Sequence, residues 1–393
     1  MSESWSNGIL LFEDAKWKNF APLTLTRPVS ELRIGIGSIA EKWSSATGAL
    51  NVSPLTRPGL RDWFPPGPGE ILVNARLIPQ PDLVERITQL GANEALEISG
   101  EIIAARCHPN NLSGNGLTKY EWIGEAILID RVTDLFTLND KVLRLDFKRL
   151  DMSESQGLPE GNQIIGPADQ LFVAPGAKVL ASVINTSTGP VYIGNDAEIM
   201  EGCMIRGPFA LGDHATLKMG AKIYGASTIG PHCKVGGEFS NSVMFGFSNK
   251  AHDGFIGNSV IGEWCNLGAD TNNSNLRNDY GSVKLWSGVS ETFEDTGLTF
   301  CGLIMGDHSK AGINSMFNTG TVVGVSCNLF GGDFLPKYIP SFSWGGAGEI
   351  EVYRFDKAME VASRMMERRN VSLTDTTKEL LKSIAVAEGR FEN

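Results

Sequence analysis

The sequence predicts an α/β domain over residues 1–155, a parallel β-helix over residues 160–345 and a helical segment over residues 350–393. Three observations support this fold class. The chain has 393 residues, too many for one ordinary hydrophobic core. Its 45 glycines exceed the usual share of ~7% and favour a turn-rich β architecture. An apolar residue also recurs at every sixth position in the middle of the chain.

The first part of the chain alternates between strand-like and helix-like patterns. Buried strands are expected at Ile9–Phe12, Glu70–Val73 and Ala126–Asp130. Helical spacing occurs over Glu31–Trp43 and Asp82–Gly91. The proline-rich run Pro54–Gly69 predicts a loop between them. Such alternation is typical of an α/β domain.

The repeat in the middle of the chain is its strongest structural signal. The apolar positions are Ile193, Ile199, Ile205, Leu211, Leu217, Ile223, Ile229 and Val235. A mostly small residue follows four places later, at Ala197, Cys203, Phe209, Ala215, Ala221, Ser227, Cys233 and Phe239. A period of six fits no helix, whereas short strands joined by turns produce it. Glycines that recur at every third hexad indicate three strands per coil of a β-helix.

Two stretches interrupt the repeat, and a different pattern follows it. We expect Phe239–Phe255 and Asp270–Phe300 to leave the coils as loops on a binding face, because insertions in solenoids cluster on one face. Beyond the repeat, Glu351–Arg369 is amphipathic, and Ser372–Asp375 predicts the cap of a second helix that ends near Ala387. These helices are expected to close the open end of the solenoid or to pack against a neighbour.

Composition excludes several classes of protein. The net charge of −11 and the lack of a basic stripe argue against nucleic acid as a partner. An acidic start and the lack of a long apolar run predict a cytoplasmic protein with no membrane partner. The six cysteines are spread singly, which indicates neither a disulfide framework nor a zinc site.

A more specific signal lies at the first interruption. The run Val235–Val243, then Asn249–Gly262, Glu263–Thr271 and Ser274–Arg277, resembles the bifunctional sugar-1-phosphate nucleotidylyltransferase/acetyltransferase family, typified by N-acetylglucosamine-1-phosphate uridylyltransferase/glucosamine-1-phosphate acetyltransferase. The resemblance implies a left-handed β-helix and acetyl transfer from acetyl-CoA to an amino-sugar-1-phosphate such as glucosamine-1-phosphate. It also implies a role in UDP-N-acetylglucosamine biosynthesis and a homotrimer in which neighbouring subunits complete each acyl site.

The resemblance assigns roles to three residues of this chain. His252 falls on the family's general base, which accepts a proton from the sugar amine, a task that imidazole performs near neutral pH. Asn266 and Asn275 fall on asparagines that contact the sugar and support the acetyl-transfer site.

Three basic residues nearby are candidates to hold the sugar phosphate: Lys250, Arg277 and Lys284. The chain departs from the family pattern at Phe255, where tyrosine is usual, at Asp270, which adds a carboxylate, and at Leu303, where serine is usual.

The first domain is similar to nucleotidyltransferases, which use Mg²⁺. The likeness rests on Ile9–Phe12 and Pro22–Val29, and it makes Arg27 a candidate nucleotide-binding residue. The family's glycine-rich phosphate loop is replaced by Glu13–Asn19, and Asn74–Arg76 stand where the metal-binding aspartate is expected. Asp130 is an alternative aspartate, and no metal ligand is assigned. The domain is interpreted as a divergent nucleotidyltransferase-like domain.

Two alternative functions stay open. One is nucleotidyl transfer alone, from UTP or dTTP to a sugar-1-phosphate. The other is a non-catalytic β-helix scaffold that binds a sugar nucleotide. A zinc site is disfavoured, since His214 and His232 are one coil apart but no third histidine keeps their register. These two, with His108 and His308, are expected to be solvated turn residues.

Overall fold

The computed structural model describes residues 5, 8–112 and 116–391. The chain forms two compact units. The N-terminal unit contains Met1–Phe20, Arg27–Leu32 and Gly37–Arg131; the solenoid unit contains Ala21–Thr26, Arg33–Ile36 and Val132–Asn393. The division falls at Arg131 and not at residue 155, because the segment after it bonds to the solenoid. Asn139 Nδ2 donates to the carbonyl of Ala226 at 2.9 Å and to Thr228 Oγ1 at 3.1 Å.

A six-stranded sheet is the centre of the N-terminal unit. Its order is β4 (Val52–Leu55), β1 (Ile9–Phe12), β5 (Ile71–Asn74), β8 (Glu101–Arg106), β7 (Glu94–Ile98) and β9 (Thr118–Glu121). Strand β1 runs parallel to both β4 and β5. Helices α1 (Ile39–Thr47) and α2 (Pro81–Thr88) and the short strands β3 (Gly37–Ser38), β6 (Leu77–Ile78) and β10 (Ile127–Leu128) complete its regular structure.

Three of the six predicted elements of this unit are confirmed, and three are corrected. The helix expected over Glu31–Trp43 begins only at Ile39, after Ser38, whose hydroxyl accepts from the Glu41 N–H in a capping box. The predicted loop Pro54–Gly69 starts inside strand β4, which tolerates Pro54 because it is an edge strand. The strand expected over Ala126–Asp130 shrinks to β10, which pairs with β6 and lies outside the main sheet.

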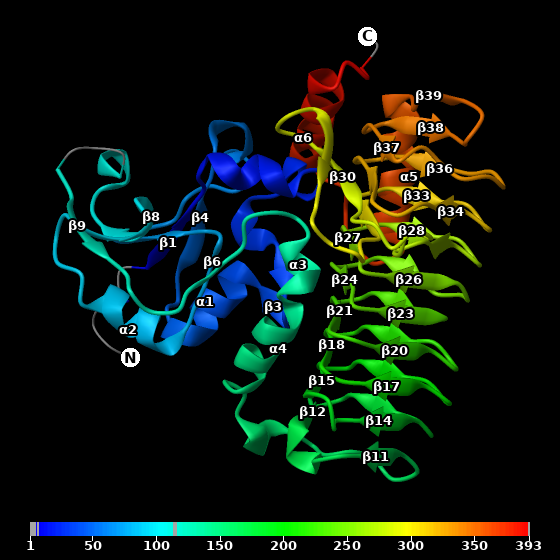
Figure 1. Cartoon of the computed structure of the whole chain (residues 1–393), viewed down its shortest axis with the longest axis horizontal. Coiled ribbons are helices and arrows are strands. Elements are labelled where there is room, and N and C mark those ends of the chain that lie inside the picture. The colour runs from blue at the N-terminus through cyan, green and yellow to red at the C-terminus, as the bar shows by residue number, and fades with distance from the viewer. Residues whose placement is uncertain (1–4, 6–7, 113–115, 392–393) are drawn as a thin grey trace. The chain divides into compact units, whose positions relative to one another are not determined.

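The solenoid unit is a parallel β-helix, as predicted. Figure 1 shows β11, β14, β17, β20, β23 and β26 stacked one above the next. The first solenoid sheet contains β11 (Gln163–Ile165), β14 (Val183–Asn185), β17 (Met204–Arg206), β20 (Lys222–Tyr224), β23 (Glu238–Ser240) and β26 (Phe255–Gly257). The second contains β12 (Leu171–Val173), β15 (Val191–Ile193), β18 (Phe209–Leu211), β21 (Ser227–Ile229), β24 (Val243–Met244), β27 (Val260–Ile261), β32 (Leu303–Met305), β35 (Thr321–Val323) and β37 (Tyr338–Ile339).

The third solenoid sheet is the longest. It contains β13 (Lys178–Val179), β16 (Glu198–Ile199), β19 (Thr216–Leu217), β22 (Lys234–Val235), β25 (Asn249–Lys250), β28 (Asn266–Leu267), β33 (Lys310–Ala311), β36 (Asn328–Leu329), β38 (Ser343–Gly345) and the antiparallel β39 (Ile350–Val352). All eight predicted apolar positions and the eight residues that follow them lie in the buried core of these coils. The hand of the coil stays a prediction of the resemblance.

The first predicted interruption is wrong, because the coils continue through Phe239–Phe255. Strands β23, β24, β25 and β26 all stay in register with their neighbours. Only the length of the coil changes, since Val235 pairs with Lys250, closer in sequence than Leu217 is to Val235.

The second interruption is an insertion, as expected. After β29 (Asn272–Asn273), which pairs with β34 (Met316–Phe317), the chain forms an antiparallel hairpin of β30 (Lys284–Ser287) and β31 (Thr292–Asp295). Trp286 of this hairpin stacks on Tyr338 of β37, with ring centroids 4.2 Å apart. The hairpin therefore folds back on its own solenoid.

Helices stand at both ends of the solenoid sequence. Helices α3 (Asp134–Thr137) and α4 (Asn139–Phe147) and strand β2 (Arg33–Ile34) precede the coils. The two predicted C-terminal helices are α5 (Phe355–Glu367) and α6 (Asp375–Ala387), and Thr374 caps α6 by accepting from the Thr377 N–H. In the described part of the chain, no helix has both the length and the apolar character that a membrane span requires.

Candidate active site

His252 lies on the bend that joins β25 of the third solenoid sheet to β26 of the first. The bend needs Gly254, whose φ of 118° disfavours any other residue and whose added Cβ would lie 2.3 Å from the Thr271 carbonyl oxygen. His252 and its neighbour Asp253 are exposed. The bend therefore presents the imidazole at the surface of the coil.

Lys250 supports this bend from inside, which argues against its predicted role in phosphate binding. The side chain is only 1% exposed, and Nζ donates to the carbonyls of His252 at 2.6 Å and of Asp253 at 2.5 Å. Lys250 occupies the inward register position that Val235 holds in the preceding coil. Its ammonium group thus points away from any ligand and fixes the backbone that carries His252.

A row of polar side chains crosses the third sheet beside this bend. Lys234, Asn249, Asn266 and Lys310 occupy paired positions on β22, β25, β28 and β33. They lie at successive levels of the solenoid because residues that pair between strands share one face. Asn266 is exposed, and it lies on the same face as the other three.

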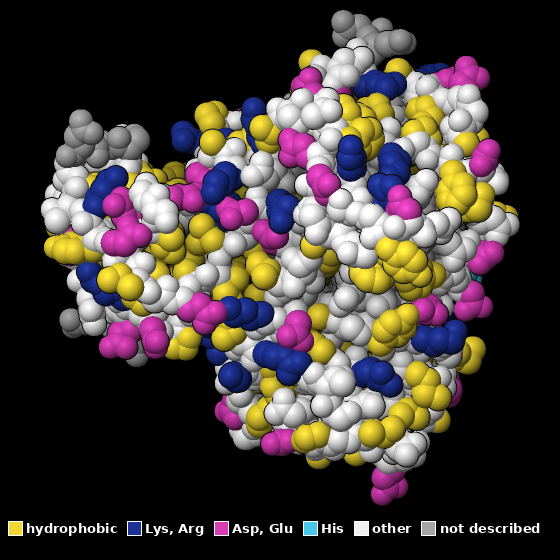
Figure 2. Space-filling model, in the orientation of Figure 1, with side chains coloured by type: hydrophobic (Ala, Val, Ile, Leu, Met, Phe, Trp, Pro, Cys, Tyr) yellow, Lys and Arg dark blue, Asp and Glu magenta, His cyan; other side chains and the backbone are white. Residues whose placement is uncertain are grey.

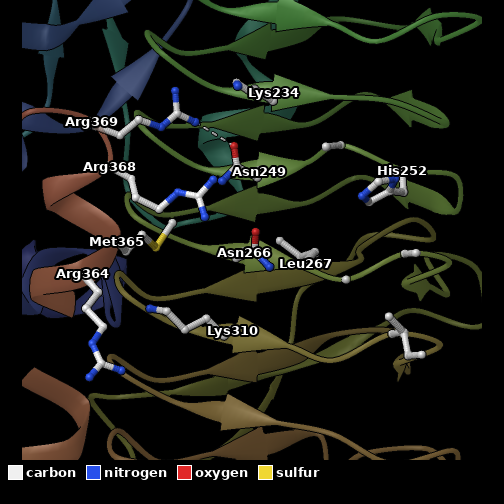
Figure 3. A pocket seen from close by; sticks show the side chains of 14 residues that line it. Lys234, Asn249, His252, Asn266, Leu267, Lys310, Arg364, Met365, Arg368 and Arg369 are labelled. Atoms are coloured by element: carbon white, nitrogen blue, oxygen red, sulfur yellow. Dashed lines mark hydrogen bonds between the residues drawn. The ribbon is translucent and has the colours of Figure 1, made fainter. Parts of the chain in front are cut away.

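The region around helix α5 adds basic side chains opposite this row. A pocket of about 730 Å³ is lined by His252, Asn266, the two lysines of the row, and Arg364, Arg368 and Arg369. Arg369 donates to Asn249 Oδ1 at 3.0 Å. Figure 3 shows the three arginines on one side of the row and His252 on the other. The pocket therefore places an imidazole and a group of cations on opposite sides of a row of polar residues.

The pKa values of both lysines in this pocket are lowered, and burial is the largest cause for each. Burial, followed by the charges of Arg369 and Lys218, lowers the pKa of Lys234. Burial lowers the pKa of Lys310 to about 8. Among the described residues that line the pocket, none is acidic. A site of this kind favours an anion such as a phosphate group.

The structure does not bring the remaining predicted residues to this pocket. Asn275 donates to Asn258 Oδ1 at 2.8 Å, at the corner between β26 and β27, which is the other edge of the first sheet from His252. Arg277 is paired with Asp279, and their hydrogen bond lowers the pKa of Asp279 to about 2. Lys284 is exposed on the inserted hairpin. Within one chain, Asn266 and His252 line one pocket, whereas Asn275, Arg277 and Lys284 lie outside its lining.

The positions that depart from the family pattern also lie outside the pocket lining. Leu303 is fully buried in the coil core. Phe255 is half-buried at the start of β26, and Asp270 is exposed at a turn with a φ of 56°. The missing hydroxyl groups at 255 and 303 therefore remove nothing from the pocket of one chain.

The N-terminal unit contains a second charged group of residues, here called the ion cluster: Asp14, Lys16, Arg76, Glu101 and Asp130. Asp130, the alternative metal ligand, accepts from Lys16 at 3.0 Å and from Arg76 at 2.5 Å. Cations of the chain already neutralise these carboxylates, so the residues do not fit the Mg²⁺ that the family resemblance implies. Arg27 is buried, with 7% of its surface exposed, and its role in nucleotide binding stays a prediction.

Of the other four histidines, His108 and His214 are exposed as expected, whereas His232 is half-buried and His308 is buried. The rings of His214, His232, Phe247, Trp264 and His308 stack in a row at successive corners. His308 is buried, at 7% exposure, whereas His214 is exposed. Within residues 5, 8–112 and 116–391, no group of three or more histidine, cysteine or acidic side chains could hold a metal ion.

A second hollow of about 710 Å³ lies on the first solenoid sheet, at strands β14, β17 and β20. Met204 is 55% exposed there and Tyr224 is 40% exposed. Figure 2 shows hydrophobic side chains over this part of the solenoid face. Its lining lacks the imidazole that the first pocket has, so we take the first pocket as the candidate active site.

Sequence reasoning missed the basic residues of the pocket. Arg364, Arg368 and Arg369 lie far along the chain from His252, and only their clustering near the end of the predicted amphipathic segment signalled a basic patch. Lys234 and Lys310 could have been found by extending the register of Asn266 to the neighbouring coils.

Comparisons with known proteins find matches to parts of this chain. Residues 9–155 match a family model described as sugar nucleotidyl transferase. Over 90 residues the chain is 37% identical to the bifunctional protein GlmU of Methanocaldococcus jannaschii, a match that covers 23% of this chain. The match spans only 21% of the length of that relative.

Solved structures match about half of this chain at low similarity. UDP-N-acetylglucosamine acyltransferase from Campylobacter jejuni is 13% identical, with 55% of this chain and 98% of that chain covered and a TM-score of 0.27. AntD, an N-acyltransferase from Bacillus cereus, is 12% identical, with 55% and 99% covered and a TM-score of 0.21. Residues 9–155 therefore resemble a sugar nucleotidyl transferase domain, and a stretch of 90 residues resembles part of the bifunctional protein GlmU.

Proposed function

We propose that the solenoid unit transfers an acetyl group from acetyl-CoA to the amine of an amino-sugar-1-phosphate, with glucosamine-1-phosphate as the leading substrate. One observation carries this proposal: the exposed imidazole of His252 lines the same pocket as Asn266 and five basic side chains. The resemblance of Val235–Arg277 to acetyltransferases of the GlmU type gives the imidazole its role.

In this proposal His252 is the general base. The sugar nitrogen attacks the thioester carbonyl carbon and a C–N bond forms, while His252 accepts the proton that the nitrogen loses. The C–S bond then breaks, and the departing thiolate takes a proton and leaves as free coenzyme A. Asn266 contributes an amide that can both donate to and accept from the sugar hydroxyls.

The basic end of the pocket suits the phosphates of coenzyme A. Arg364, Arg368 and Arg369 lie at the end away from His252 in Figure 3. Coenzyme A is an extended molecule whose phosphates and thioester lie at opposite ends, so phosphates at the arginines would leave the thioester free to approach His252. Arginine forks are well suited to phosphate oxygens.

We further propose a homotrimer, in which a neighbouring copy supplies the residues that stand apart within one chain. Asn275, Arg277 and Lys284 lie away from His252 in one chain, and a neighbour's copies would complete the sugar-phosphate site. The exposed apolar side chains of the first solenoid sheet support packing between copies. We expect this reaction to occur in the cytoplasm and to supply UDP-N-acetylglucosamine.

The test is an assay of free-thiol release from acetyl-CoA in the presence of glucosamine-1-phosphate. We expect His252→Ala to lower the rate by about 10²- to 10⁴-fold, the usual contribution of a general base. The matched control is His214→Ala, which removes an exposed imidazole outside the pocket and should retain the wild-type rate. Unchanged thiol release in His252→Ala would remove the imidazole from the mechanism.

The second candidate is nucleotidyl transfer by the N-terminal unit, which the family match over residues 9–155 favours. Its test is Mg²⁺-dependent release of pyrophosphate from UTP or dTTP with a sugar-1-phosphate, and loss of that release in Arg27→Ala. Calorimetric binding of a sugar nucleotide without any product would instead favour the non-catalytic scaffold.

A further inference from the structure

The ion cluster lies where an open α/β sheet usually binds its ligand. Strands β1 and β5 are neighbours; the chain leaves β1 towards β4 on one side and leaves β5 towards β7 and β8 on the other, so the connections that leave these two strands run in opposite directions. Ligands bind outside the carboxyl ends of the strands at such a point. Asp14 follows the end of β1, and Arg76 follows the end of β5. The cluster thus occupies the expected binding position of the N-terminal unit.

Arg76 is at the centre of this cluster. Its side chain is only 1% exposed. Nε donates to Asp14 Oδ2 at 2.9 Å, one terminal nitrogen donates to Asp130 Oδ1 at 2.5 Å, and the other is paired with Glu101. A further bond from Arg76 reaches the Ile129 carbonyl at 3.0 Å. The guanidinium therefore binds all three carboxylates at once.

Lys16 adds a second cation to the same carboxylates. Its Nζ lies 3.0 Å from both Glu101 Oε2 and Asp130 Oδ1. Burial alone would raise the pKa of Asp14, but hydrogen bonds from Arg76 and Asn74 outweigh burial and lower it. Two cations that belong to the chain are thus paired with the three carboxylates.

A magnesium ion would need the same carboxylate oxygens that are already bonded to Arg76 and Lys16. It takes near-octahedral oxygen ligands, usually carboxylates together with water and substrate phosphates. To reach Asp14, Glu101 and Asp130, the ion would have to displace a buried guanidinium, which would then lack its partners. Leaving a buried charge unpaired is strongly unfavourable. Arginine also stays charged at all physiological pH values, so the exclusion does not depend on pH.

We infer that Arg76 replaces the divalent cation of a metal-dependent nucleotidyltransferase, so that the N-terminal unit binds no catalytic metal at the carboxyl ends of β1 and β5. Nucleotidyl transfer that depends on Mg²⁺ at this position is then lost, and any role of the unit is metal-independent. The inference concerns the N-terminal unit alone, so it stands or falls separately from acyl transfer in the solenoid unit.

The experiment measures binding of Mn²⁺, a paramagnetic substitute for Mg²⁺, to the full chain by electron paramagnetic resonance. Wild type is expected to show no Mn²⁺ site that depends on Asp14. Arg76→Ala, which frees the carboxylates and opens space, is expected to gain one site, and Arg76→Ala/Asp14→Asn is expected to lose it again. Stoichiometric Mn²⁺ binding by wild type that Asp14→Asn abolishes would overturn the inference.

Two further measurements keep the inference testable if Arg76→Ala does not fold. Wild type and Asp14→Asn alone suffice, because a difference in Mn²⁺ binding between them contradicts the inference and equal binding supports it. Asp213→Asn, an acidic residue of the solenoid unit, is the matched control. Weak Mn²⁺ binding that all these variants share lies outside the cluster and also supports the inference.

Discussion

The two charged regions of this molecule are built on opposite principles. In the ion cluster of the N-terminal unit, three carboxylates surround a guanidinium that is 1% exposed. In the pocket of the solenoid unit, the described lining residues with a full charge are all basic. Opposite charges that are paired with one another stabilise the fold, and they are not available to bind a charged ligand. Charges of one sign gathered in a pocket cost stability, and a bound anion offsets that cost.

The largest expected effect is on the free energy of unfolding, which a substitution in the ion cluster should change much more than one in the pocket. Arg76→Met keeps an apolar stem but leaves Asp14, Glu101 and Asp130 without their common partner. We expect a loss of roughly 3–5 kcal/mol in the free energy of unfolding, the usual result of breaking a buried ion pair. Urea unfolding followed by circular dichroism measures it.

The matched control for this prediction is Arg368→Met in the pocket. Removing one of several like charges there should change the free energy of unfolding by less than about 1 kcal/mol, in either direction. Equal losses in the two variants would show that the cluster and the pocket do not differ in the way described.

The sequence alone could predict the solenoid and half of its candidate site. The spacing from Ile193 to Val235 names the core directly, since inward positions repeat with the coil. His252 and Asn266 lie on adjacent coils and line one pocket, while their catalytic and sugar-binding roles stay predictions. Lys250 was misassigned because its basic side chain suggested a ligand, whereas its register opposite Val235 points it inward.

The remaining charged residues are brought together by contacts between distant parts of the chain, which a local sequence pattern cannot predict. Arg369 reaches Asn249 only because helix α5 returns along the third sheet after the coils have ended. Arg76 likewise meets Asp14 and Asp130 through the packing of three separate segments. No sequence period or motif predicts either of these tertiary contacts.

Lys250 tests what happens when a buried cation has no carboxylate bonded to it. Burial lowers its pKa to about 8 from the ordinary 10.5. Between these values the unfolded chain binds the proton more tightly, so wild type gains stability as the pH rises from 8 to 10.5. Relative to Lys250→Met, this gain should be on the order of 3 kcal/mol. Urea unfolding of both proteins at several pH values measures the difference.

The same variant also tests whether Lys250 positions His252. The bend should loosen without its bonds to the carbonyls of His252 and Asp253, so kcat should fall while KM for acetyl-CoA stays close to wild type. A stability difference that does not vary with pH would contradict the assigned pKa. An unchanged kcat would show that the bend holds its shape without the ammonium group.

Removing two pocket cations should weaken binding with little loss of stability. For Arg368→Ala/Arg369→Ala we expect the Kd of acetyl-CoA to rise about 10- to 100-fold, as for loss of one or two charged hydrogen bonds. Isothermal titration calorimetry measures the change. Arg354→Ala is the matched control, because Arg354 is paired with Asp356 and lies outside the pocket lining. Equal effects of the two variants would argue against a phosphate site at the arginines.

The smallest expected effect is on how acetyl-CoA binding depends on salt concentration. Lys234 is exposed at the pocket, and its pKa is lowered by burial and by the charges of Arg369 and Lys218. Lys234→Ala should weaken acetyl-CoA binding only a few-fold at low ionic strength, and the difference should vanish near 1 M salt, where the Debye length falls to about 3 Å. The stability lost in Arg76→Met should change little over the same range, because buried pairs are poorly screened. If salt abolished both effects alike, the ion cluster would be as open to solvent as the pocket, and its carboxylates would be accessible to a metal after all.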